Sequence, residues 1–283
     1  MEGVAASRPS KEPFMTRTPV LFVSHGAPTF ALQPGRLGPA LAKVGEQLPR
    51  PRAVLVVSPH WMTRGLRVAT TAQPETVHDF GGFDPALYRI QYPAAGHPEL
   101  AARAIEVLRA AGWPVEADEQ QGLDHGTWVP IRFLYPDADV PVFQVSLPAG
   151  ITAQQAYALG QALRPLRDEG VLVVGSGSLT HNLYEFRMHD DGHEAEYARE
   201  FAAWVRQAVE VRDDVRLQDT LRIAPHAQRA HPTAEHFLPL LVAAGAASDE
   251  QAVKTLEGGI TDGVLAMDSY LYGAPALQSA EAR

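Results

Sequence analysis

The feature that most constrains the fold is a set of short apolar runs that alternate with helical patterns. Runs rich in Val, Leu and Phe occupy residues 20–23, 53–57, 141–147 and 171–174. Continuous runs of this kind are typical of strands covered on both faces, because a solvated face requires polar residues at alternate positions. Helical patterns occupy residues 37–48, 97–111, 153–167, 194–212 and 233–244. The alternation predicts one α/β domain with a mostly parallel central sheet flanked by helices.

No linker and no repeat of fixed period divides the 283 residues. We expect a flexible N-terminal extension over residues 1–17, a folded domain over 18–275 and a C-terminal tail over 276–283. Met15 lies just before the first apolar run and is an alternative to Met1 as the start of translation. The last helical pattern is expected to begin at Thr233, which is a good N-cap residue.

Composition excludes several classes of protein. The chain has 33 acidic and 24 basic residues, for a net charge of −9. Phosphate backbones and anionic lipid would repel such a chain, so we expect no nucleic-acid and no membrane partner. It has no cysteine, which excludes disulfides, thiolate ligands and iron–sulfur clusters and is consistent with a cytoplasmic location.

Three histidines follow predicted strands at equivalent positions. His25 and His60 come shortly after two apolar runs, and His181 follows the run at 171–174. Ligands of α/β sheets bind beyond the carboxyl ends of the strands, so these imidazoles are predicted to share a metal site there. Without cysteine, zinc or non-haem iron must be bound by His with Asp or Glu. Candidates for the remaining positions are His125, Glu235 and His236.

Two other motifs resemble known sites but lack residues that those sites need. Gly175–Ser176–Gly177 lacks the third glycine of a dinucleotide loop, because Thr180 stands in its place, so we expect a tight strand-to-helix turn. His193–Glu194 lacks the second histidine of a zinc-peptidase helix, because Tyr197 occupies that position. We expect solvated or capping roles for another set of histidines, namely His97, His189, His193 and His226.

A set of short segments resembles the class III extradiol ring-cleavage dioxygenases of the LigB superfamily, in particular the DOPA 4,5-dioxygenase-type branch. The segments occur in the family's order and span almost the whole chain. They are SHGAP at 24–28, SPHW at 58–61, HDFGGF at 78–83, GLDHGTW at 122–128, GSG at 175–177 followed by HNL at 181–183, and PTAEH at 232–236.

The resemblance implies an α/β fold around one divalent metal, with a small-molecule catechol such as DOPA and O₂ as substrates and a semialdehyde as product. Fe(II) would support activity, and Zn(II) is expected in purified protein because it competes for nitrogen ligands. His25, His60 and His236 match metal-binding positions. The family similarity also implies that residues 18–275 form the catalytic domain.

The resemblance also implies roles for two further histidines, His181 and His125. His181 matches a histidine beside the metal that acts as an acid or base or as an extra ligand, and His125 matches a second-sphere histidine of the pocket. Other superfamily members complete the site with a carboxylate, so Glu235 is an alternative to its neighbour His236. Spacing supports neither strongly, because adjacent helical residues point about 100° apart; His236 is favoured.

Alternative functions stay open at this point. A zinc-dependent hydrolase could use the same histidines, because zinc generates hydroxide near neutral pH. A non-catalytic metal or aromatic-ligand binder is a third possibility. The aromatic segment from Phe80 to Tyr92 is predicted to wall the pocket, with Asp79, Tyr88 and Arg89 either contacting polar substrate groups or packing in turns.

Overall fold

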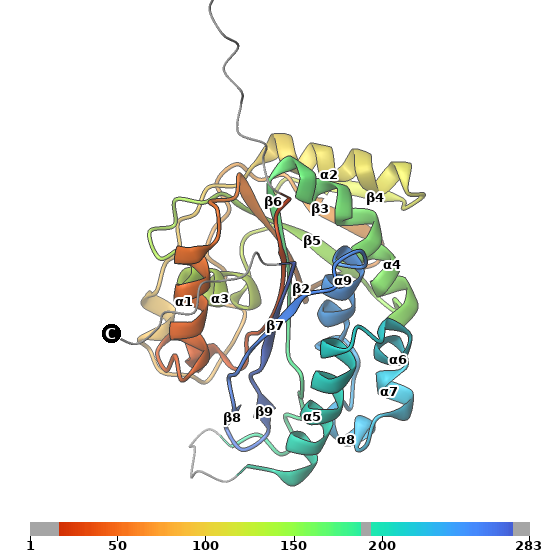
Figure 1. Cartoon of the computed structure of the whole chain (residues 1–283). Helices are drawn as coiled ribbons and strands as arrows, with labels where there is room; N and C mark the ends of the chain where they lie inside the picture. Colours follow the sequence, from red (N-terminus) through yellow and green to blue (C-terminus); the bar gives the residue numbers. More distant parts are fainter. Residues whose placement is uncertain (1–16, 188–193, 274–283) are drawn as a thin grey trace, which may run out of the picture.

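A computed structural model describes residues 17–187 and 194–273 of the chain (Figure 1). The predicted terminal extension and tail fall almost wholly outside these residues, as do His189 and His193. Within the described part, a twisted sheet has the strand order β4-β3-β5-β2-β6-β1-β10-β7. Its strands are β1 (Val20–Ser24), β2 (Ala53–Thr63), β3 (Leu66–Ala69), β4 (Val115–Asp118), β5 (Val142–Pro148), β6 (Val171–Gly177), β7 (Val253–Leu256) and β10 (Ser269–Tyr272).

The inner strands β5, β2, β6 and β1 are mutually parallel. Beyond β1, β10 pairs antiparallel with β1, and β7 pairs antiparallel with β10. On the other edge β3 pairs antiparallel with β5 and parallel with β4. Two short strands, β8 (Ile260–Thr261) and β9 (Leu265–Ala266), form a separate antiparallel pair. The predicted mostly parallel sheet is therefore confirmed, and its parallel part is the centre.

Helices cover both faces of the sheet (Figure 1). On one face α3 packs against β2 and β6, with α1 beside it, while α9 and α4 lie on the other. The helices are α1 (Leu37–Gln47), α2 (Pro98–Ala110), α3 (His125–Leu134), α4 (Ala153–Leu163), α5 (Glu196–Glu210), α6 (Asp214–Gln218), α7 (Thr220–Ile223), α8 (Ala227–Ala230) and α9 (Leu238–Ala246). None of the described helices has the length and apolar character needed to cross a membrane.

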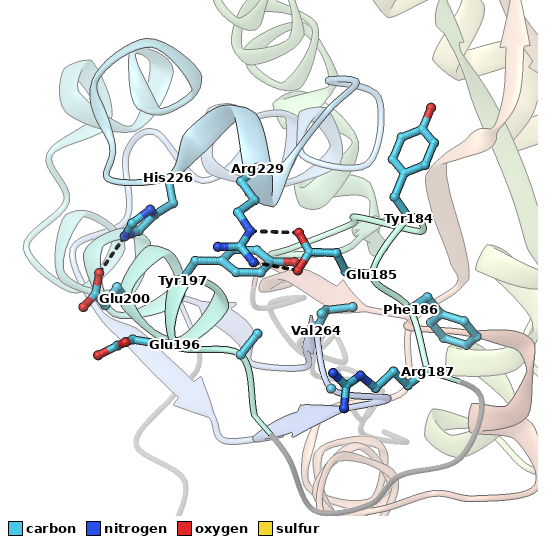
Figure 2. Close-up of a pocket in the computed structure, with 12 residues that line it drawn as sticks. Tyr184, Glu185, Phe186, Arg187, Glu196, Tyr197, Glu200, His226, Arg229 and Val264 are labelled. Carbon is cyan, nitrogen blue, oxygen red and sulfur yellow. Dashed lines mark hydrogen bonds and ion pairs between the residues drawn. The ribbon is translucent and has the colours of Figure 1, made fainter.

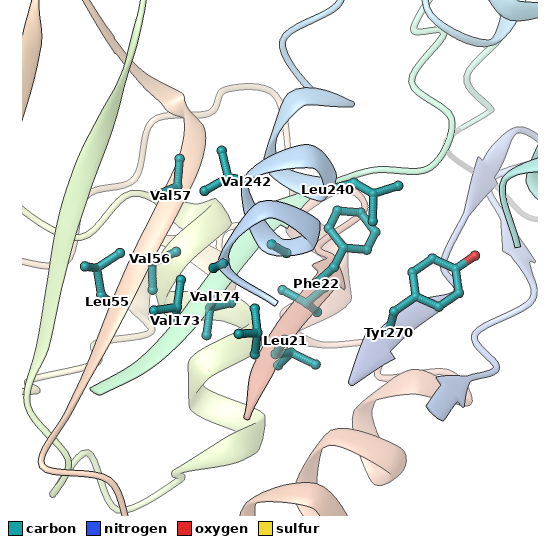
Figure 3. Close-up of a cluster of buried hydrophobic side chains, with 14 of the residues drawn as sticks. Leu21, Phe22, Leu55, Val56, Val57, Val173, Val174, Leu240, Val242 and Tyr270 are labelled. Carbon is teal, nitrogen blue, oxygen red and sulfur yellow. The ribbon is translucent and has the colours of Figure 1, made fainter. Parts of the chain in front are cut away.

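The core confirms the interpretation of the apolar runs. Side chains of β1, β2 and β6 meet Leu240 and Val242 of α9 (Figure 3). Val56, Val173 and Leu240 are each 0% exposed. Complete burial of such a side chain contributes roughly 1.5–3 kcal/mol, so the central strands anchor the edge of the sheet from which the histidines project.

The glycines of Gly175–Ser176–Gly177 do not form a strand-to-helix turn; they are the last residues of β6. A Cβ on Gly175 would lie 2.0 Å from the carbonyl oxygen of Pro239, and one on Gly177 would lie 2.3 Å from that of His236. Both positions therefore need glycine because the backbone entering α9 packs directly on the strand. This close approach brings His236 to the end of β6.

The predicted start of the last helix, at Thr233, is wrong. α9 begins at Leu238, without a side-chain cap, and Thr233 instead donates a hydrogen bond from Oγ1 to Glu235. Glu235 and His236 thus precede the helix. The other helical predictions agree with α1, α2, α4 and α5 within a few residues, apart from the end of the third pattern, which continues as a 3₁₀ helix over Arg164–Glu169.

Candidate metal centre

The histidines predicted to form the site lie together at the carboxyl ends of β1, β2 and β6. His25 directly follows β1, and His181 lies in the loop after β6. His60 does not follow its strand: β2 continues to Thr63, with a shift of register between Val57 and Met62. This irregular stretch carries His60. The remaining two are His125, the first residue of α3, and His236.

Ring distances show how tight the group is. The His60 and His125 centroids are 4.0 Å apart, and the His181 ring stacks on His236 at 3.4 Å with 8° between the planes. The His25 ring lies 5.0 Å from His60 and 5.6 Å from His236. The structure therefore brings all five histidines into one cluster.

Three of the rings direct a nitrogen toward one another. The Nε2 atoms of His25 and His60 are 3.2 Å apart, and His236 contributes a ligand atom within 4.8 Å of both. Nε2 of His236 is buried and has no hydrogen-bond partner within the described residues. Leaving such an atom unpaired costs about 1–3 kcal/mol, which a bound cation would remove. Three imidazoles suit Zn(II) or Fe(II), so this donor set fits a divalent metal.

The opposite nitrogens of these rings have protein partners. Nδ1 of His25 lies 2.9 Å from Oγ of Ser176, and Nδ1 of His236 lies 3.2 Å from Oε1 of Glu235. Nδ1 of His60 lies 3.4 Å from a carboxylate oxygen of Asp79. Partners on the outer nitrogen orient a ligating imidazole and raise its basicity. Glu235 thus contacts the outer side of His236.

The Ser176 hydroxyl determines the tautomer of His25. Its one proton is donated to the carbonyl oxygen of Gly126, so toward the ring Oγ can only accept. Nδ1 of His25 is therefore the protonated nitrogen, and Nε2 carries the lone pair that faces His60. Sequence analysis did not identify Ser176 as part of the site, although it lies between the two glycines of the GSG segment.

Burial favours the neutral form of four histidines of the cluster, namely His25, His60, His181 and His236. Burial, with further contributions from neighbouring imidazoles, lowers the pKa of His25 and His236 well below the usual value. Burial lowers the pKa of His60 to about 3 and that of His181 to about 4. Metal binding requires unprotonated imidazole, so the site needs no loss of protons before it can bind metal near neutral pH.

Asp79 joins two of the histidines. Its Oδ1 accepts hydrogen bonds from both the backbone nitrogen and Nδ1 of His125, each at 2.9 Å. Partial burial raises the pKa of Asp79, but the hydrogen bonds and charge of His125 outweigh this and hold it below its usual value. From the sequence, Asp79 was expected to contact substrate or to pack in a turn. The structure instead places it against the Nδ1 atoms of His125 and His60.

A cavity of about 380 Å³ opens beside the cluster. Four histidines contribute to its wall, namely His60, His125, His181 and His236. Its apolar side chains include Phe80, Phe83, Leu183, Phe186 and Leu265. The predicted aromatic wall is thus present in part: Tyr88 packs behind Phe80, with centroids 5.1 Å apart, and neither Tyr88 nor Arg89 is among the described residues that line the cavity.

A larger cavity of about 820 Å³ is lined in part by residues of the segment that follows His181, among them Tyr184 and Glu185 (Figure 2). Two pairs of its charged groups contact each other: Arg229 binds both oxygens of Glu185 at 2.8 Å, and His226 contacts Glu200 at 2.7 Å. None of the five clustered histidines lines it. His226 thus has the surface role expected for it, as does His97, whose Nδ1 caps α2 by accepting from Leu100.

Comparisons with known proteins identify the family of the chain. Residues 24–261 match the family described as the catalytic LigB subunit of aromatic ring-opening dioxygenase. The chain is 39% identical to a 4,5-DOPA dioxygenase extradiol of Escherichia coli (strain K12), over 91% of this chain and 96% of the relative. It is 37% identical to the protein of the same description from Beta vulgaris, over 89% and 95% of the two chains.

A solved structure is also similar. An uncharacterized protein from Escherichia coli K12 superposes with a TM-score of 0.76 at 34% identity, covering 91% of this chain and all of the other. The matched region includes every histidine of the cluster, because the family match begins at Ser24 and ends at Thr261.

Proposed function

We propose that this chain, which belongs to the LigB family of aromatic ring-opening dioxygenases, opens the ring of a catechol beside its diol with O₂, giving a semialdehyde acid. DOPA is a candidate substrate, since two curated relatives carry its name. The observation that carries the proposal is the convergence of three imidazole nitrogens next to a cavity that also presents two further histidines.

His25, His60 and His236 are the proposed metal ligands. Family membership makes the enzyme metal-dependent, and the three-histidine set fits Fe(II). Bound at these residues, Fe(II) would supply the redox chemistry that lets O₂ react with a catechol. Zn(II) is the expected contaminant because it binds nitrogen sites more tightly than Fe(II). Glu235 orients His236 through Nδ1 in this assignment.

His181 is proposed to move the phenolic proton of the substrate. Its pKa of about 4 leaves the imidazole neutral near pH 7, so it can accept a proton and release it readily in a later step. It lines the cavity and stacks on His236, which holds the ring in one orientation beside the proposed ligands.

His125 is proposed to act as a hydrogen-bond and proton donor to the reacting oxygen atoms. Asp79 accepts from Nδ1, so a proton taken up by the ring sits on Nε2, on the opposite side of the imidazole. The carboxylate also stabilises the charged imidazolium, as an acidic partner does in other histidine pairs. The apolar wall around Phe80 and Phe83 excludes water from the same space.

A zinc-dependent hydrolase is the second candidate, because a three-histidine set with an open position also suits catalytic Zn(II). The family match favours ring opening. A purely binding protein is disfavoured, because His125 and His181 supply acid and base groups in excess of the proposed ligands. The expected cytoplasmic location stays a prediction, and so does the domain boundary at residue 275.

The deciding experiment is anaerobic reconstitution with Fe(II), followed by addition of O₂ and a panel of catechols that includes DOPA. Oxygen uptake and visible absorbance are recorded together, and a Zn(II)-loaded sample is the control. Stoichiometric uptake with a yellow product, in the Fe(II) sample alone, is the expected result. Iron-loaded protein that consumes no oxygen with any catechol would redirect the assignment to hydrolysis.

A further inference from the structure

A buried carboxylate that has no role in the proposed reaction lies next to His125 in the chain. Asp124 is the N-cap residue of α3 and is only 2% exposed. Burial of a carboxylate is costly unless hydrogen bonds satisfy its oxygens. The groups that satisfy Asp124 therefore show which parts of the structure it holds together.

Both oxygens of the Asp124 carboxylate accept hydrogen bonds. Oδ1 accepts from the Ser58 hydroxyl at 2.9 Å and from the backbone nitrogen of Thr127 at 3.0 Å. Oδ2 accepts from Nε2 of Gln144, whose Oε1 in turn accepts from the backbone nitrogen of Asp124 at 3.3 Å. Ser58 belongs to β2 and Gln144 to β5, and both are fully buried. One carboxylate therefore joins the first turn of α3 to two central strands.

The bond to Ser58 extends to the backbone of His60. The Ser58 hydroxyl donates to Asp124 and accepts from the backbone nitrogen of His60 at 3.3 Å. A Cβ on Gly126 would lie 2.6 Å from Oγ of Ser58 and 2.9 Å from Cδ2 of His60. It would also lie 3.1 Å from Oδ1 of Asp124. The His60 ring thus packs directly against the turn that Asp124 caps, in the stretch of β2 where the strand register shifts.

The same turn of α3 contacts two more histidines of the cluster. His125 is the first residue of the helix. The carbonyl oxygen of Gly126 accepts from the Ser176 hydroxyl, which contacts Nδ1 of His25. This one turn therefore touches the surroundings of two proposed ligands, His25 and His60, and carries the proposed proton donor.

We propose that Asp124 is a positioning residue of the metal site, which sets His60 and His125 relative to each other through its hydrogen bonds to Ser58, Gln144 and the first turn of α3. The inference rests on the proposed function, because it concerns a metal ligand and a proton donor named there. Asp79 contacts the rings of the same two histidines. Asp124 acts instead on the backbone that carries them.

A swap of the hydrogen-bonding groups between Asp124 and Gln144 tests the inference. In Asp124→Asn, either orientation of the new amide places its NH₂ against a donor, which is Nε2 of Gln144 or the backbone nitrogen of Thr127. Adding Gln144→Glu turns the opposing donor into an acceptor and restores the bonds. We expect Asp124→Asn to weaken Zn(II) binding about 10–100-fold, measured by calorimetry, and the double variant to recover most of that loss.

Co(II) at saturating concentration separates positioning from stability, because its visible absorption spectrum depends on the directions of its ligands. The spectrum of Asp124→Asn should differ from that of the wild type, and the spectrum of the double variant should match it. Asp213→Asn, at the N-cap of α6 outside the site, is the control and should keep the wild-type affinity and spectrum. If Asp124→Asn does not fold, Ser58→Ala provides the same test, since it removes the link to His60 and leaves the cap of α3.

Two results would overturn the inference. One is a wild-type affinity and spectrum in the folded single variant, and the other is a double variant no better than Asp124→Asn. The metal measurements require no turnover. A wild type that binds Co(II), and whose iron-loaded form consumes no oxygen with any catechol, would therefore contradict ring opening alone.

Discussion

A single carboxylate oxygen of Asp79 holds His125 at two points, since Oδ1 lies 2.9 Å from both the backbone nitrogen and Nδ1 of that residue. One atom of Asp79, which lies 46 residues earlier in the chain, thus fixes both the first residue of α3 and the side chain of that residue, His125. The other oxygen lies 3.4 Å from Nδ1 of His60. Asp79 therefore couples a proposed proton donor to a proposed metal ligand.

Replacing Asp79 by Asn should lower turnover per bound metal. The amide cannot stabilise an imidazolium at His125, so in protein loaded at saturating metal we expect kcat to fall about 10²-fold, at the lower end of an acid–base contribution. Because Asp79 also contacts His60, metal affinity should fall by up to about 10–100-fold. The pH profile of kcat should change shape, which a purely structural defect would not produce. Asp84→Asn, in the same loop, is the control. Wild-type kcat and pH profile in Asp79→Asn would contradict the assignment.

His25→Ala and His60→Ala should each abolish stoichiometric metal binding, because either change removes one of two Nε2 atoms that lie 3.2 Å apart. The measurement is metal content by elemental analysis after anaerobic loading and desalting, with circular dichroism to verify the fold. His226→Ala, an exposed histidine outside the cluster, should retain full metal. Full iron content in either site variant would show that the ligand assignment is wrong.

Glu235→Ala and His236→Ala should behave differently. Loss of an outer partner typically weakens metal binding about 10–100-fold, whereas loss of a ligand removes the site. We therefore expect Glu235→Ala to bind metal at raised concentration and His236→Ala to bind none. Titration of both variants with Zn(II), monitored by calorimetry, compares them directly. The reverse order of affinities would make Glu235 the ligand.

Gly177→Ala should displace His236 and so weaken the metal site. The added methyl would lie 2.3 Å from the carbonyl oxygen of His236, so the segment that carries this residue must shift. Overpacking of this kind costs typically 1–3 kcal/mol, which urea denaturation measures, and metal affinity should fall with it. Gly65→Ala is the control, because a Cβ there meets no atom within 4 Å. Unchanged affinity in Gly177→Ala would contradict the packing argument.

Acid should destabilise the metal-free protein before its carboxylates titrate. Burial lowers the pKa of His231 to about 4 and, as described above, that of His60 to about 3 and His181 to about 4. Below pH 6.5 the unfolded chain binds protons that the folded chain excludes, so stability is full above pH 6.5 and declines toward pH 4. The melting temperature, recorded from pH 7.5 to 5, should fall. His231→Gln should reduce the slope, and a flat profile in the wild type would refute the argument.

Much of the architecture follows from the sequence itself. Val20 to Val23 and Val171 to Val174 are apolar at every position, and short runs of this kind rich in Val are typical of strands covered on both faces. Parallel strands align their carboxyl ends, so histidines placed after these runs had to approach one another. The family resemblance, carried by local motifs, is confirmed by a match over residues 24–261. These features depend on the local pattern of residues, which can be read directly from the sequence.

Only the tertiary structure decided how the side chains face each other. The start of α9 moved from Thr233 to Leu238, because the backbone at His236 packs on Gly177 and cannot be inferred from capping preference. In the same segment Glu235 contacts Nδ1 of His236, and Nε2 has no hydrogen-bond partner among the described residues. Asp79 reached His125 through a contact between distant segments. Side-chain direction depends on such long-range contacts, and propensity and spacing carry no information about them.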